Sequence, residues 1–171
     1  MPEILSLRGD GTLFVDARRF VLDADTAGAD DAILPLALWR ARVAAGTTPS
    51  AVWLAPDEDY AALGPFVDAL QLVALALPKA ADGRAYSIAT LLRTRHRYLG
   101  ELRAIGDVAI DQLYYLRRVG FDSAELPPHR TNAATLATVR EILKTFGDSY
   151  QAAADQPLPL FRRRPQNEAV R

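Results

Sequence analysis

The residues of this chain that are best suited to chemistry are charged side chains at the ends of predicted strands. Proteins with parallel sheets and covering helices usually bind their ligands at such strand ends. The six candidates for binding an anion or a substrate there are Lys79, Asp82, Arg84, Arg103, Asp107 and Glu125. One ammonium and two guanidinium groups suit an oxyanion such as a carboxylate, a phosphate or a sulfur oxyanion. Nothing in their spacing identifies a catalytic residue.

Arg103 differs from the other candidates because it lies inside a predicted strand, between two apolar residues. An isolated buried charge costs several kcal/mol, so its guanidinium group must be paired or must extend into a polar cavity. The favoured interpretation is a structural ion pair with Glu101, Glu125 or Asp107. The alternative is ligand binding.

The loop from Lys79 to Arg84 contains the next candidates. Lys79 is one of only two lysines in the chain, and it is either a solvated loop residue or a ligand for an anion. Asp82 and Gly83 form a common turn sequence. Arg84 precedes a predicted helix, and the free N–H groups at a helix N-terminus favour an anion. Asp107 is most simply the N-cap of the following helix.

Alternating strand and helix patterns position these candidates. Strands are predicted over residues 32–34, 51–55, 72–77, 99–106 and 121–126, and helices over residues 35–45, 57–70, 86–96, 108–119 and 131–150. This alternation predicts an α/β fold with a mainly parallel sheet of about five strands and covering helices. Either an open sheet or a partial β/α barrel fits the pattern. Two apolar runs around residues 9–11 predict a β-hairpin before the sheet.

The 171 residues are enough for one domain and too few for two domains of ordinary size. We predict a single α/β domain over residues 1–155, with the hairpin inside residues 1–30. The segment 156–171 has no core-forming pattern, so we expect a mobile tail there. The apolar stripe on the helix over 131–150 indicates ordinary core packing or, as the alternative, the seam of a homodimer.

Composition argues against several classes of function. The formal net charge of -1 argues against a nucleic-acid-binding protein. With no cysteine and only two histidines, a metal site built on these residues is not expected. The glycine motifs of dinucleotide-binding proteins and P-loops are absent. No apolar run is long enough to span a bilayer and no secretion signal is recognisable, so we predict a cytoplasmic protein.

The central part of the chain contains a specific set of motifs. They are Pro78-Lys79, Asp82-Gly83-Arg84, Leu91-Leu92-Arg93, Gly100-Glu101-Leu102-Arg103-Ala104, Gly106-Asp107 and Gly120-Phe121-Asp122. With these motifs the chain resembles the bacterial family called domain of unknown function 934, over about residues 30–151. Ala80 and Ala85 stand where that family usually has an aromatic residue and a second glycine.

The resemblance implies a role in sulfate assimilation, because genes of this family commonly lie beside the gene for assimilatory sulfite reductase. We therefore expect an accessory protein of sulfite reduction that binds the reductase or a small sulfur oxyanion at the carboxyl edge of the sheet. Members are usually described as oxidoreductases without an assigned reaction. One alternative is thus an independent enzyme that borrows a flavin or a nicotinamide, and another is a non-catalytic interaction scaffold.

Overall fold

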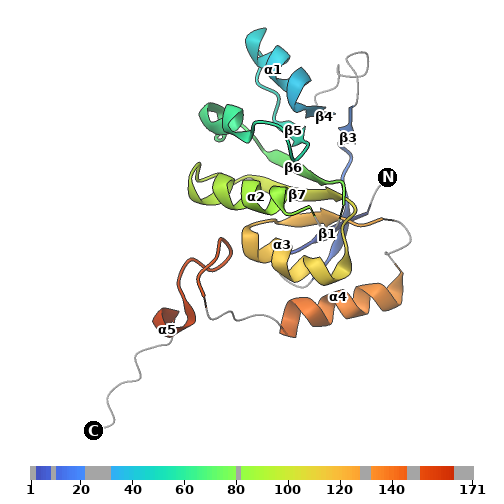
Figure 1. Ribbon diagram of the computed structural model, residues 1–171. Coiled ribbons are helices and arrows are strands. Elements are labelled where there is room, and N and C mark those ends of the chain that lie inside the picture. The colour runs from blue at the N-terminus through green and yellow to red at the C-terminus, as the bar shows by residue number, and fades with distance from the viewer. Residues whose placement is uncertain are drawn as a thin grey trace.

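The structure, a computed structural model, describes residues 3–8, 11–21, 32–79, 82–127, 132–145 and 151–163. These residues form one eight-stranded sheet with helices packed against it (Figure 1). The strands are β1 (Glu3–Ser6), β2 (Leu13–Val15), β3 (Arg19–Phe20), β4 (Ala32–Pro35), β5 (Ala51–Leu54), β6 (Leu72–Leu77), β7 (Glu101–Gly106) and β8 (Ser123–Glu125). The helices are α1 (Leu36–Ala44), η2 (Tyr60–Phe66), α2 (Arg84–Thr94), η3 (Ile110–Gln112), α3 (Leu113–Val119), α4 (Ala133–Thr145) and α5 (Leu160–Arg163).

Neighbouring strands follow the order β2-β1-β8-β7-β6-β5-β4-β3 across the sheet. The strands from β3 to β8 are parallel, whereas β1 is antiparallel to both β2 and β8. The predicted α/β fold, its mainly parallel sheet and its N-terminal hairpin are therefore confirmed. The sheet has more strands than predicted because the hairpin and the short β3 extend its two edges.

The connection from β2 to β3 forces the sheet to curl. These strands are opposite edges of the sheet, yet only residues 16–18 separate them. Eight strands in a flat sheet would place the two edges about 34 Å apart, since neighbouring strands lie about 4.8 Å from each other. The chain from Val15 to Arg19 spans about 14 Å at most. The sheet is accordingly curled into a half-barrel, which is the partial barrel among the predicted alternatives.

Hydrophobic residues pack on both faces of the curled sheet. Alternate residues of β6 show the division, because Val73 and Leu75 belong to the core under the helices while Leu72 and Ala74 belong to the inner face. Figure 1 shows α1, α2 and α3 stacked along the helix-covered face. The inner core is small and consists of Ile33, Ala51, Leu72 and Ala74, with Phe20, Trp53 and Ile105 packed against it.

Two helices begin at residues other than those predicted. α2 begins at Arg84, two residues before the predicted start of the helix at residue 86. The helix predicted over 108–119 is a 3-10 turn, η3, followed by α3, and the residue before η3 is Ala109. Asp107 is therefore not an N-cap. Gly120 follows the predicted helix end at residue 119 and caps α3 in the left-handed conformation, with a φ of 108°.

The C-terminal part of the chain is described in two pieces. α4 accounts for the predicted helix as far as Thr145, and residues 146–150 lie outside the described residues. Residues 151–155 contact α3, where Ala154 N donates to Arg118 O at 3.1 Å, and α5 follows them in the chain. The domain boundary at 155 and the mobile tail stay predictions, and residues 164–171 lie outside the described residues.

We expect Gly106→Ala to lower the free energy of unfolding by about 3 kcal/mol. Gly106 ends β7 with a φ of +98°, and a Cβ there would lie 2.6 Å from Leu77 O, a backbone atom of the neighbouring strand. Gly46→Ala is the matched control, because Gly46 has a φ of +87° but open space around its Cβ position. The control variant should lower the free energy of unfolding, measured by urea denaturation, by about 1 kcal/mol. Equal losses for the two variants would contradict the contact with Leu77.

Candidate functional site

Lys79, Asp82 and Arg84 lie together at the carboxyl edge of the sheet, in the turn from β6 to α2. Asp82 N donates to Lys79 O at 2.9 Å, which closes the turn. The Asp82 carboxylate accepts hydrogen bonds from Arg84 N, Nε and Nη2 at 3.1, 3.0 and 2.7 Å. A carboxylate of the chain itself is therefore bound where α2 begins, the position in which an external anion was expected.

The charges of this turn nearly balance. Hydrogen bonds from the Arg84 side chain and backbone lower the pKa of the Asp82 carboxyl to about 2. The Arg84 side chain is still 57% exposed, and Lys79 is exposed as well. Asp57, which follows β5, places another negative charge near Arg84. The carboxyl edge thus presents cations and carboxylates side by side, a surface suited to a partner with mixed charges.

Asp107 and Glu125 are also at strand ends but in different surroundings. Asp107 follows β7 and is exposed, and its N–H donates to Leu77 O at 2.8 Å. Glu125 ends β8 on the inner face, since its neighbour Ala124 packs in the core under the helices. Burial raises the pKa of Glu125, although the charge of Arg103 offsets part of the effect. The structure therefore brings Glu125 and Arg103 to the inner face, apart from the turn at Lys79.

Arg103 lies on the inner face of β7 and is 1% exposed. Its Nε and Nη2 donate to Glu101 Oε1 at 3.0 and 2.7 Å, and Nη2 also donates to Asp16 Oδ2 at 2.5 Å. Ser123 Oγ donates to the same oxygen of Glu101 at 2.5 Å. The ion pair favoured for Arg103 is thus present with Glu101. Asp16 is a second partner that the sequence did not indicate.

Asp16 lies in the segment that joins the two edges of the sheet and connects this segment to Arg103 of β7. It accepts hydrogen bonds from Arg18 N at 2.9 Å and Arg18 Nε at 3.0 Å, in addition to that from Arg103. Arg18 Nη2 lies 3.3 Å from Glu101 Oε2. We call Asp16, Arg18, Glu101 and Arg103 the inner-face cluster; it contains two positive and two negative charges. Burial raises the pKa of Asp16, but hydrogen bonds from Arg18 and Arg103 outweigh it and lower this pKa to about 2.

Arg93 forms a second network at the amino edge of the sheet, opposite the turn at Lys79. Its Nε and Nη1 atoms donate to three backbone carbonyl oxygens, those of Gly120 at 3.0 Å, Tyr98 at 2.6 Å and Gly100 at 2.8 Å. Its Nη2 donates to Asp122 at 2.5 Å. One guanidinium group therefore holds the end of α2 to the segments that enter β7 and β8. This role uses the planar arrangement of arginine donors, which lysine lacks.

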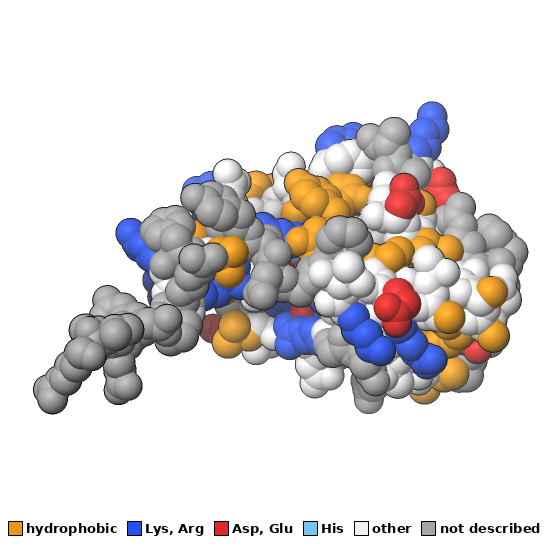
Figure 2. Space-filling model, turned by 90° about the horizontal axis from the view of Figure 1, so that it is seen from below, with side chains coloured by type: hydrophobic (Ala, Val, Ile, Leu, Met, Phe, Trp, Pro, Cys, Tyr) orange, Lys and Arg blue, Asp and Glu red, His pale blue; other side chains and the backbone are white. Residues whose placement is uncertain are grey.

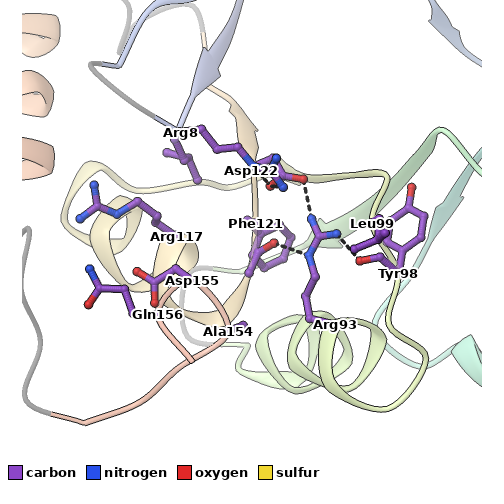
Figure 3. Close-up of a pocket in the computed structure, with 12 residues that line it drawn as sticks. Arg8, Arg93, Tyr98, Leu99, Arg117, Phe121, Asp122, Ala154, Asp155 and Gln156 are labelled. Atoms are coloured by element: carbon purple, nitrogen blue, oxygen red, sulfur yellow. Dashed lines mark hydrogen bonds and ion pairs between the residues drawn. The ribbon is translucent and has the colours of Figure 1, made fainter. Parts of the chain in front are cut away.

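Two cavities lie beside this network, with volumes of about 620 Å³ and about 250 Å³. Arg8, Leu99 and Asp122 line both of them. Figure 3 shows the larger cavity, with Arg93 on one side and Arg117 on the other. Seen from below, basic side chains lie beside the end of the molecule where α5 lies and also at other places on this face (Figure 2). None of the six residues predicted from sequence lines either cavity.

The protein is an α/β half-barrel. Cations and carboxylates lie side by side at the carboxyl edge of its sheet, and Arg93 connects the segments at the amino edge. A family model described as "Bacterial protein of unknown function (DUF934)" matches residues 51–161, and the chain belongs to this family. No curated protein and no solved structure matches it. Within the described ranges, no helix is both long and apolar enough to cross a membrane, and no group of three or more acidic, histidine or cysteine residues could hold a metal ion.

The amino-edge network is the part of the candidate site that sequence reasoning missed. Its signal was present, because Arg93, Gly100 and Asp122 belong to the motifs that resemble the family. Their function was not deducible from spacing, since Arg93 binds backbone carbonyl groups of segments that only the tertiary fold brings together. The same holds for Asp16, which is 87 residues from Arg103.

We expect the stability of the protein to fall as the pH decreases from about 4 to about 2. The folded-state pKa of Asp16, about 2, is below its ordinary value of 3.8, so its contribution is complete above 3.8 and is lost as the carboxyl is protonated. Asp16→Asn should reduce the slope of unfolding free energy against pH in this window, measured by urea denaturation. Asp68→Asn, which removes an exposed carboxylate, is the control. A slope unchanged by Asp16→Asn would contradict the assignment.

Proposed function

We propose that this protein is an accessory protein of assimilatory sulfite reduction that binds the sulfite reductase through the carboxyl edge of its sheet. The observation that supports the proposal is family membership over residues 51–161. Genes of this family are expected to lie beside that of the reductase. An accessory protein needs a surface on which its partner can dock, and the turn at Lys79 offers one.

The geometry of this turn favours the reductase over a small sulfur oxyanion as the partner. The start of α2 is already bound by Asp82, so an incoming oxyanion would compete with a carboxylate held by three hydrogen bonds. An exposed mixture of Lys79, Arg84 and Asp57 is better suited to a protein surface, where charge complementarity determines specificity and association rate. Arg103 is assigned to the inner-face cluster instead, because it is buried and bound to carboxylates.

A deletion strain supplied with one sulfur source at a time tests this proposal. We expect growth on sulfide and failure on sulfate and on sulfite, because only sulfide enters metabolism after the reductase. Unimpaired growth on all three sources would contradict the proposal.

Complementation of the same strain tests the docking surface. The double variant Lys79→Ala/Arg84→Ala should restore growth on sulfite several-fold more slowly than the wild-type gene, since loss of rim charges chiefly slows association. Arg40→Ala is the matched control, because Arg40 is exposed on α1. Full complementation by the double variant would place the docking surface elsewhere on the molecule.

A further inference from the structure

The larger amino-edge cavity has no part in the proposed function. Its volume of about 620 Å³ is within the range of about 300–1,000 Å³ that is usual for small-molecule sites. Its walls come from the end of α2, the end of α3, the residues before β7 and β8, and residues 154–156 (Figure 3). Segments from distant parts of the sequence thus surround one space large enough for a metabolite.

The cavity has more positive than negative charge. Arg8, Arg93 and Arg117 line it together with Asp122 and Asp155. Arg93 and Arg117 stand in the last turns of α2 and α3, where positive charge stabilises the negative end of a helix. Arg8 follows β1 and has no such role. No helix end therefore accounts for its positive charge.

Arg8 is also the most accessible charged group of the cavity. Its side chain is 67% exposed, and its ion pair among the described residues is with Asp122. Asp122 is bound by Arg93 and by Leu102 N as well, so it keeps partners if Arg8 moves. A guanidinium group carries five donors, and Arg8 uses only Nε and Nη2 on Asp122. Donors therefore remain for an oxyanion.

An apolar wall adjoins these charges. Leu99 is 89% exposed although it lines the cavity, and Leu7 and Phe121, which also line it, have exposures of 0% and 2%. A leucine in this position loses unfavourable contact with water when an apolar group covers it. The combination of cation and apolar wall suits a ligand that carries both an oxyanion and an apolar part.

Asp155, one of the lining residues, has a buried oxygen without a hydrogen bond to a described residue. This atom, Oδ1, lies 3.8 Å from its ion-pair partner Arg118 Nη1, and Arg118 does not line the cavity. Most buried polar atoms in folded proteins have a hydrogen-bond partner. The carboxylate of Asp155 adds a negative charge to the wall, which opposes the binding of an anion.

We propose that this cavity binds a small organic anion, with its oxyanion group on Arg8 and its apolar part against Leu99 and Phe121. Arg93 and Arg117 add positive charge while they keep their hydrogen bonds to backbone carbonyl oxygens. The site lies at the opposite edge of the sheet from the turn at Lys79. Its occupancy is therefore independent of the proposed docking surface.

Calorimetric titration of the full chain with phenyl phosphate and with inorganic phosphate tests the site. We expect saturable binding of phenyl phosphate, and at least tenfold weaker binding by Arg8→Ala, because a hydrogen bond between charged groups is lost. Leu99→Ala should weaken binding of phenyl phosphate and leave that of inorganic phosphate unchanged. Arg40→Ala, an exposed arginine on α1, is the control and should bind like the wild type.

Asp155→Asn provides an independent measurement, because it should raise the affinity for phenyl phosphate whereas Arg8→Ala and Leu99→Ala should lower it. Removal of a negative charge from the cavity should tighten binding of phenyl phosphate several-fold, whereas a variant that merely disturbed the wall would weaken it. The melting temperature of each variant, measured without ligand, separates loss of folding from loss of binding. Absence of saturable binding to the wild type, or equal affinities of Arg8→Ala and Arg40→Ala, would overturn the proposal.

Discussion

The ion pairs of Arg103 with Glu101 and Asp16 are the interaction on which the rest of this structure depends. A link of three residues between the two edge strands requires a curled sheet, and no described helix contributes to the core on its inner face. The small apolar core of Ile33, Ala51, Leu72 and Ala74 fills part of this face. Arg103 lies on the same face, and its charge is tolerable there because it is paired with carboxylates from β7 and from the linking segment.

Arg103 is bound within the inner-face cluster and contributes to neither edge of the sheet. The two edges differ in the charged groups that they present. At the carboxyl edge, Lys79 and Arg84 stay exposed beside Asp82, which indicates a surface for a partner rather than an enclosed pocket. At the amino edge, Arg93 and Asp122 hold α2, β7 and β8 together, and the cavities form around them. Parallel α/β proteins usually bind ligands at the carboxyl edge, so a cavity at the opposite edge is a departure with a local cause. That cause is the contact of residues 151–155 with Arg118 in the last turn of α3.

The sequence predicted the parts of this fold that local patterns determine. The apolar run Leu72–Leu77 is a central strand with residues in both cores, and α3 ends at Val119, where the sequence predicted a helix end. Helix starts were less predictable, because Gly83 precedes α2 without a side-chain cap. Among the candidate residues, the grouping of Lys79, Asp82 and Arg84 followed from their proximity in sequence. The bond from Arg103 to Asp16 and the contacts of Arg93 did not, since they join segments that meet only after folding.

A double-mutant cycle between Arg103 and Asp16 tests the central claim most directly. Urea denaturation at neutral pH would compare the wild type with Arg103→Met, Asp16→Asn and the double variant. Because Arg103→Met removes one partner of a buried ion pair, we expect it to lower the free energy of unfolding by about 3–5 kcal/mol. Asp16→Asn should cost at least about 1 kcal/mol less when Arg103 is already absent. Additive effects, or a change of under about 0.5 kcal/mol for Arg103→Met, would contradict the account.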